Sequence, residues 1–250
     1  MSTSIPRVLS IAGTDPTGGA GIQADLKSIA ANGGYGMAVV TALVAQNTVG
    51  VRSVHVPPVS FLRDQLDAVS DDVGIDAVKI GMLATAEVTI AVDRWLARVR
   101  PPVVVLDPVM VATSGDRLLD AEAEQALGDL VRRADLVTPN VPELAILAGE
   151  PVATSWEEVL EQAERVSARH GVLVVAQHVD GQRPSAQQER QGAGAAVDGD
   201  RQPRRLGADR HDGGRRQAVA CALMRGGDDR HGGCELAHAL AVLVVCNSHI

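Results

Sequence analysis

A glycine-rich turn between an apolar strand and an amphipathic helix constrains the fold of this chain most strongly. The β-branched run at 8–12 is typical of a buried strand, and Ile22, Leu26 and Ile29 share one face of a helix predicted over 22–31. The intervening segment carries four glycines, which let a backbone come close to a small ligand. Asp25 is expected in the first turn of this helix, where the helix dipole stabilises a carboxylate. The segment contains neither a P-loop nor the Gly-x-Gly-x-x-Gly spacing.

Strands and helices are predicted to alternate along the first 175 residues. Strands are predicted over 8–12, 37–43, 51–56, 77–80, 103–106, 136–137 and 172–175, and helices over 22–31, 59–72, 86–99, 120–132, 142–148 and 156–170. This alternation indicates an α/β fold with a mostly parallel sheet covered by helices on both faces. Ligands bind such sheets beyond the carboxyl ends of the strands. Gly13, Gln46 (in a loop), Gly81, Asp107 and Asn140 each follow a predicted strand, so we expect them to line one crevice.

Composition excludes several classes of protein. A length of 250 residues suits one substantial α/β domain, and the net charge of −8 argues against a nucleic-acid surface. No apolar run is long enough to span a membrane, and no signal peptide is apparent. Three cysteines, all late in the chain, argue against a disulfide framework and fit a reducing cytoplasm.

The character of the chain changes near residue 176, which divides it into a predicted core over 1–176 and an aberrant or partly disordered region over 177–250. The second region is rich in arginine and glutamine at first, and it has no sustained helical or strand periodicity up to about residue 230. A long segment without structure is unusual inside a compact domain. A reading-frame change, strong divergence and a genuine Arg-rich disordered tail are all open explanations.

Five ordered sequence blocks carry a resemblance to a known family. They are Ser10 to Asp25, Thr41 to Thr48, Lys79-Ile80-Gly81-Met82-Leu83, Leu106-Asp107-Pro108-Val109-Met110 and Thr138-Pro139-Asn140-Val141-Pro142-Glu143. Over residues 7–175 the chain resembles the hydroxymethylpyrimidine and phosphomethylpyrimidine kinases of thiamine biosynthesis. The resemblance implies a ribokinase-like three-layer sandwich, a homodimer, and ATP-dependent phosphorylation of 4-amino-5-hydroxymethyl-2-methylpyrimidine and its monophosphate. Pyridoxal kinases share the fold, and a pyridoxal-type kinase is an alternative.

The resemblance also implies a pocket for an aminopyrimidine. An amide offers both a donor and an acceptor, so Gln46 is the candidate for reading the ring edge, and Asp25 is a candidate acceptor for the amine or the hydroxymethyl group. Val44 and Val109 could equally be plain core residues. The implied substrate-binding residues are Gly13, Asp25, Val44, Gln46, Met82 and Val109.

Asp107, Asn140 and Glu143 are implied to hold ATP and Mg²⁺, with Asp107 and Glu143 nearest the metal. Carboxylate and amide oxygens suit this hard cation. Asn140 also fits a helix N-cap, and Glu143 could be a first-turn charge, so structural roles stay open beside the functional ones.

The family's last block, His-Gly-Thr-Gly-Cys, forms an anion hole for phosphate at a helix N-terminus. Residues 231–241 keep a version that is one residue short, which makes Gly232, Gly233 and Cys234 the implied catalytic residues. His231, Cys234 and His238 also have the spacing of a zinc site, but no fourth ligand is evident. This chain also has Ala176-Gln177-His178 where the family has Lys-Gly-Gly-His. Because both motifs are altered, a catalytically inactive pyrimidine-binding protein is the second hypothesis.

Overall fold

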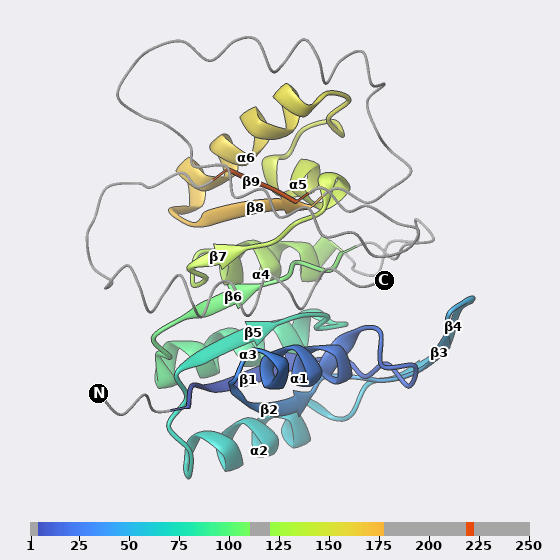
Figure 1. Cartoon of the computed structure of the whole chain (residues 1–250), viewed down its shortest axis with the longest axis vertical. Coiled ribbons are helices and arrows are strands. Elements are labelled where there is room, and N and C mark those ends of the chain that lie inside the picture. The colour runs from blue at the N-terminus through green and yellow to red at the C-terminus, as the bar shows by residue number, and fades with distance from the viewer. Residues whose placement is uncertain (1–4, 111–120, 178–218, 223–250) are drawn as a thin grey trace. The chain divides into compact units, whose positions relative to one another are not determined.

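The structure is a computed structural model that describes residues 5–110, 121–177 and 219–222 (Figure 1). The chain divides into two compact units, one within residues 1–136 and the other within residues 137–228. Each unit is described by itself. The predicted anion-hole block at 231–241 lies outside the described residues.

The first unit is built on a parallel sheet whose strands occur in the order β2-β1-β5-β6. Its elements are β1 (Arg7–Ala12), α1 (Gly21–Ala31), β2 (Tyr35–Val40), β3 (Leu43–Asn47), β4 (Gly50–His55), α2 (Val59–Ser70), β5 (Ala77–Ile80), α3 (Ala86–Val99), β6 (Val104–Leu106) and α4 (Ala121–Val131). The short strand β7 (Leu136–Val137) falls at the boundary between the units.

The core of this unit lies on both faces of the sheet. Every residue of β5 and β6 is buried, and five of the six residues of β1 are buried. Helix α1 packs against β1 and β2, whereas α2, α3 and α4 contact one another in that order. In the sheet, β2 lies on one side of β1, whereas β6 lies on the opposite side of β5, so the two connections run across the sheet in opposite directions. Because connections between parallel strands are right-handed, helices α1 and α3 lie on opposite faces of the sheet. The predicted α/β fold with helices on both faces is confirmed.

Two local predictions are wrong. The strand predicted over 37–43 ends at Val40. The Thr41 N–H makes the last ladder bond, to the Ala12 carbonyl (3.0 Å), and the Thr41 hydroxyl donates to the Met82 carbonyl (2.6 Å) where the chain leaves the sheet. Gln46 is therefore not in a loop after a parallel strand. It lies in β3, which pairs antiparallel with β4 in a hairpin that extends away from the sheet (Figure 1).

Asp25 is also not in the first turn of its helix. Helix α1 begins at Gly21, and its first turn carries no acidic residue. Asp25 is 1% exposed and lies in the second turn, where the ends of the helix dipole contribute little. Side-chain partners, described below, stabilise its carboxylate instead.

The second unit contains α5 (Val141–Ala148), α6 (Trp156–His170), β8 (Leu173–Gln177) and β9 (Val219–Ala222). Helices α5 and α6 pack on each other, and α6 packs on β8. Strand β9, which the sequence did not predict, pairs antiparallel with β8. Both helices begin with a capping box and end at a glycine with positive φ, as local sequence patterns favour.

Candidate functional site

The turn after β1 brings three predicted ligand-binding residues together. A Cβ atom placed on Gly13 would lie 2.7 Å from Met82 Cε and 3.7 Å from Val44 Cγ2. At the other end of the turn, Gly21 has φ of +54°, and a Cβ there would lie 2.3 Å from the Gly13 carbonyl oxygen. Gly21 is therefore needed for close backbone approach, whereas the nearest atom at Gly13 is the end of the flexible Met82 side chain. Gly13, Val44 and Met82, which are predicted substrate-binding residues, therefore lie close together.

The hairpin is attached to the same turn through Thr14. The Thr14 N–H donates to the Ala42 carbonyl (2.9 Å), and the Val44 N–H donates to the Thr14 hydroxyl (2.9 Å). These bonds hold the base of β3 beside the glycine-rich turn, although 30 residues separate Val44 from Thr14 in the sequence. Gln46 follows two positions after Val44 on β3 and is partly buried.

Asp15 organises the turn, and sequence reasoning missed it. Its carboxylate is 1% exposed and accepts from the backbone N–H groups of Thr17 (2.9 Å), Gly19 (2.9 Å) and Ala20 (2.8 Å). Burial alone raises its pKa, but hydrogen bonding from the Gln46 side chain and from these donors outweighs burial and lowers the pKa to about 2. Asp15 is thus ionised at neutral pH and links the turn to Gln46.

A buried ionic cluster lies beneath α1. The Lys79 ammonium is 3.0 Å from Asp25 Oδ1 and 3.7 Å from Asp107 Oδ2, and the Ser10 hydroxyl donates to Asp25 Oδ2 (2.6 Å). The side chains of Lys79 and Asp25 are 4% and 2% exposed, whereas that of Asp107 is 18% exposed. Asp25 therefore has strong partners within the chain, so it has a structural role as the counterion of Lys79. The predicted role of Asp25 as an acceptor for a ligand stays a prediction.

Asp107 stands at the end of β6 next to Val109. Its N–H donates to the Ile80 carbonyl (2.8 Å), and its carbonyl accepts from the Val109 N–H (2.9 Å). Val109 is half-buried. The Asp107 carboxylate is the most accessible member of the ionic cluster and can offer an oxygen to a cation at this edge of the sheet.

Asn140 and Glu143 belong to the second unit and form the capping box of α5. The Asn140 side chain accepts from the Glu143 N–H, and Glu143 Oε2 accepts from the Asn140 N–H, both at 2.9 Å. The structural role left open for each residue is therefore present. Within the described residues no group of three or more His, Cys, Asp or Glu side chains is arranged around a common metal position. Mg²⁺ at a kinase site usually needs only one or two carboxylates beside phosphate and water, so Asp107 fits such a site.

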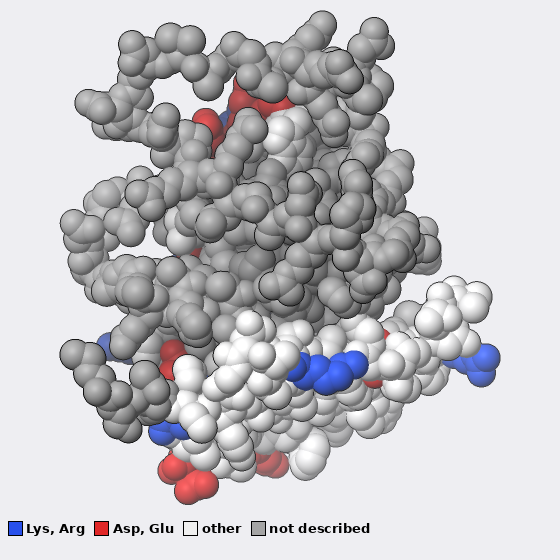
Figure 2. All heavy atoms as spheres, in the orientation of Figure 1, with Lys and Arg blue, Asp and Glu red and all other residues white. Residues whose placement is uncertain are grey.

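The predicted catalytic residues Gly232, Gly233 and Cys234 lie outside the described residues, as do His231 and His238 of the alternative zinc site. In the part of the chain that the structure describes, no helix combines the length and the apolarity that a membrane crossing requires. Figure 2 shows basic side chains in small separate groups on this face of the described residues.

The parallel sheet with helices on both faces defines the chain as an α/β protein, and its ribokinase-like character follows from the comparisons. The model of the family described as phosphomethylpyrimidine kinase matches residues 15–226, and the chain belongs to this family. The match continues beyond residue 175, where the sequence motifs cease to resemble the family.

Curated relatives agree with this assignment. The chain is 59% identical over 174 residues to the thiamine biosynthesis multifunctional protein ThiED of Corynebacterium glutamicum, which covers 70% of this chain and 23% of that protein. It is 50% identical over 175 residues to the hydroxymethylpyrimidine/phosphomethylpyrimidine kinase of Escherichia coli, and this alignment covers 69% of this chain and 66% of that enzyme. The chain thus spans a quarter to two thirds of the length of these relatives.

Solved structures show the same fold. The phosphomethylpyrimidine kinase of Clostridium difficile is 38% identical, with a TM-score of 0.65 over 70% of this chain and 77% of that one. The pyridoxal kinase of Staphylococcus aureus in complex with AMP-PCP is 31% identical, with a TM-score of 0.64 over 70% of this chain and 64% of that one. The identity is higher to the pyrimidine kinase, so the pyridoxal-type alternative is not favoured.

Proposed function

We propose that this chain phosphorylates 4-amino-5-hydroxymethyl-2-methylpyrimidine and its monophosphate in thiamine biosynthesis, with ATP as donor and Mg²⁺ as metal, in the cytoplasm. Membership of the phosphomethylpyrimidine kinase family supports this reaction. The structural observation that carries the proposal is that Gly13, Val44 and Met82 come together from three separate segments, in the unit that also holds the buried ionic cluster of Lys79 and Asp25.

The proposed pocket reads the pyrimidine through polar and apolar contacts. Gly13 leaves room for the flat ring, and Val44, Met82 and Val109 form its apolar walls. Gln46 accepts from the exocyclic amine and donates to a ring nitrogen, because a primary amide carries both functions. Asp15 supports this orientation of the amide, since an ionised carboxylate can only accept hydrogen bonds and its pKa is about 2.

The hydroxymethyl group must lie in line with the phosphate that it receives. We place it toward Asp25 and the Lys79 ammonium, which is 3.0 Å from that carboxylate. Bound Mg²⁺ would neutralise charge on the phosphates, and Asp107, Asn140 and Glu143 would hold it with its waters. Gly232, Gly233 and Cys234 complete the proposal as the anion hole for the transferred phosphate.

Replacement of Gln46 tests the pocket. In Q46A the ring loses its donor and acceptor, so we expect 10- to 100-fold weaker binding of the aminopyrimidine by calorimetry, about 1–3 kcal/mol. The matched control is A45S, which alters the exposed neighbour on the same strand and should leave the affinity unchanged. Equal affinities of Q46A and the unaltered chain, or tighter binding of pyridoxal than of the pyrimidine, would contradict the proposal.

A second candidate function is binding without phosphate transfer. The observation that favours it is the sequence of the last block, which lacks one residue of the family's anion hole. Pyrimidine binding combined with no release of ADP from ATP would establish this candidate. Release of ADP that depends on the pyrimidine would exclude it.

We also propose that the chain forms a homodimer through the hairpin. Every residue of β4 is exposed, and the large apolar side chains Leu43, Val51 and Val54 are 48–56% exposed. A two-stranded hairpin is marginally stable alone, and exposed apolar groups of this kind mark contact surfaces. Light scattering should give a dimer for the unaltered chain and a monomer for the double variant V51K/V54K. A monomeric unaltered chain would refute the proposal.

A further inference from the structure

The contacts of the Asp15 carboxylate leave no place for a proton. Its Oδ1 accepts from the Thr17 N–H (2.9 Å), and its Oδ2 accepts from the N–H groups of Gly19 (2.9 Å) and Ala20 (2.8 Å). The Thr17 hydroxyl is also 2.9 Å from Oδ1 and 2.8 Å from Oδ2. A backbone N–H can only donate, so both carboxylate oxygens must accept. Asp15 is therefore an ionised group, held in one position and 1% exposed.

The Gln46 side chain meets this carboxylate from the hairpin. Val44 and Gln46 are two positions apart on β3 and share one face of the strand. On that face a Cβ atom placed on Gly13 would lie 3.7 Å from Val44 Cγ2. The register of the β3–β4 ladder shifts at Gln46, and such irregularities re-aim a side chain. The Gln46 side chain forms a hydrogen bond with Asp15 and helps to lower the pKa of that carboxyl.

This contact fixes which way the Gln46 amide faces. One end of an amide donates and the other accepts, whereas an ionised carboxylate can only accept. The Nε2 group of Gln46 must therefore face Asp15. The reversed amide would place its carbonyl oxygen against a buried negative charge and would leave that oxygen without a donor. The Oε1 atom and the second N–H of Gln46 remain available to a ligand.

A fixed amide distinguishes two kinds of pyrimidine. The edge of a 4-aminopyrimidine presents a donor, the amine, beside an acceptor, the ring nitrogen. A 4-oxopyrimidine in its lactam form presents the reverse, an oxygen acceptor beside a ring N–H. The second edge would need the reversed amide. Sites that hydrogen-bond their substrate discriminate strongly against a mismatched analogue, because its binding leaves buried polar groups unpaired.

We propose that Asp15 is a positioning residue that makes the pocket select 4-aminopyrimidines over 4-oxopyrimidines, by fixing the orientation of the Gln46 amide. The inference rests on the proposed pyrimidine kinase function. It adds the residue that decides the class of ring, although Asp15 itself acts only through Gln46.

Calorimetric titration of the full chain with 4-amino-5-hydroxymethyl-2-methylpyrimidine and with its 4-oxo analogue tests the proposal. We expect the amino compound to bind at least 100-fold more tightly to the unaltered chain. In D15N this ratio should fall to 10 or less, because an asparagine side chain both donates and accepts and so permits both orientations of Gln46. The ratio is the readout, since a distorted turn would weaken both ligands alike.

The double variant D15N/Q46A separates this role from a general effect on the turn. Once Gln46 is replaced, Asp15 has no amide to orient, so D15N/Q46A and Q46A should have the same ratio of affinities. A further fall of the ratio in the double variant would overturn the proposal, because Asp15 would then act on the ring by another route.

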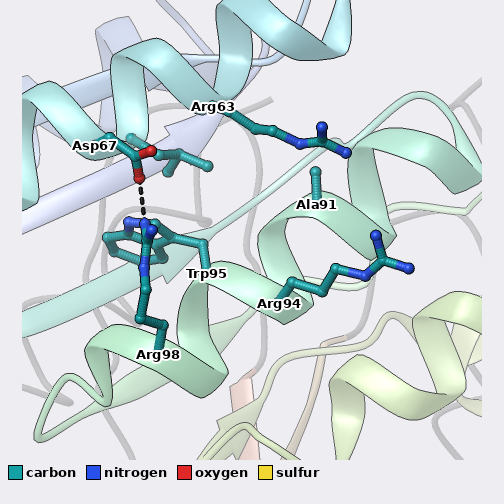
Figure 3. Close-up of a pocket in the computed structure, with 7 residues that line it drawn as sticks. Arg63, Asp67, Ala91, Arg94, Trp95 and Arg98 are labelled. Atoms are coloured by element: carbon teal, nitrogen blue, oxygen red, sulfur yellow. Dashed lines mark hydrogen bonds and ion pairs between the residues drawn. The ribbon is translucent and has the colours of Figure 1, made fainter.

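Two controls should keep the ratio of the unaltered chain. T17V removes the hydroxyl contact but keeps the three backbone donors to Asp15. R94Q alters an exposed residue of the α2–α3 groove, to which neither the glycine-rich turn nor the hairpin contributes a described residue (Figure 3). An unchanged ratio in D15N, or an equal fall in either control, would overturn the proposal and leave the kinase function standing. Failure of the unaltered chain to bind either compound would refute the kinase function and this inference with it.

Discussion

Lys79 illustrates how a single buried residue organises the first unit. Its ammonium group approaches Asp25 and Asp107, which come from α1 and from the end of β6. A Cβ atom on Gly81 would lie only 3.2 Å from Lys79 Nζ, so a small residue two positions later makes room for the ammonium group. Only two of the 23 basic residues of the chain are lysines, and the compact ammonium group suits this position better than a guanidinium group.

Replacement of Lys79 should destabilise the fold strongly. In K79M two neighbouring carboxylates lose their shared cation in a buried environment, and breaking such an ion pair costs about 3–5 kcal/mol. Urea unfolding at neutral pH measures this loss. The control is K27M, because Lys27 is exposed and its ammonium group donates to the Gly18 backbone carbonyl and not to a carboxylate among the described residues. A loss below about 1 kcal/mol in K79M, or an equal loss in K27M, would contradict a structural role for the cluster.

Asp15 should make stability depend on pH in the acidic range. Its pKa is about 2 in the folded chain and 3.8 without the fold, so its charged form contributes about 2 kcal/mol above pH 4. This contribution disappears as pH falls from 4 toward 2, because the unfolded chain binds the proton first. Unfolding of D15N and of the unaltered chain should therefore differ most at neutral pH and converge near pH 2. The exposed replacement D72N should show no such convergence.

At the scale of helices, the two capping boxes of the second unit form a matched pair. Asn140 and Glu143 begin α5, and Ser155 and Glu158 begin α6. In each box the N-cap side chain accepts a backbone hydrogen bond, and its removal costs about 1 kcal/mol. Only the box of α5 is proposed to contact magnesium and nucleotide.

The variants N140A and S155A separate the structural role from the functional one. Both should lower the free energy of unfolding by about 1 kcal/mol. Only N140A should also weaken binding of magnesium and ADP, measured by calorimetry under conditions where both variants are folded. If S155A weakens nucleotide binding as much as N140A, the effect comes from helix stability. If neither does, Asn140 has no role in nucleotide binding.

Local pattern was sufficient for elements whose partners are near in sequence. The apolar run of β5 was predicted with its observed bounds, and the Asn-x-x-Glu pattern indicated the start of α5. Strand β3 was missed because the largely apolar run of β2 extends past Thr41 to Leu43, and the bond from the Thr41 hydroxyl to the Met82 carbonyl, where the chain leaves the sheet, joins residues 41 positions apart.

Contacts between distant segments could not be predicted in this way. Asp25 and Lys79 are 54 residues apart, and no local periodicity indicates that they pair. Asp15 is different, because the sequence Asp15-Pro16-Thr17-Gly18 is typical of a turn in which the aspartate side chain accepts from nearby N–H groups. That signal was present in the sequence and could have identified the residue that holds the turn.

At the scale of the whole chain, the front part carries the residues of the proposed pyrimidine pocket, and the back part carries the altered motifs. The E. coli enzyme matches 69% of this chain, and the matched segment is 66% of its own length. The unmatched third of that enzyme is expected, from the family resemblance, to carry an unaltered anion-hole block, so residues 1–176 can be joined to it in a chimera. Comparing this chimera with the unaltered chain separates effects on pyrimidine binding from effects on the rate of phosphate transfer.

We expect the chimera to transfer phosphate from ATP to the pyrimidine 10²–10³-fold faster than the unaltered chain, because loss of one anion-hole donor reduces catalysis by about this factor. Pyrimidine affinity should be the same in both proteins, since Gly13, Val44, Gln46 and Met82 are unchanged. D107N in the chimera should abolish transfer and leave pyrimidine binding intact. Equal rates would mean that the altered block is functional. A chimera that melts cooperatively and binds the pyrimidine, yet transfers no phosphate, would refute the kinase assignment of the front part.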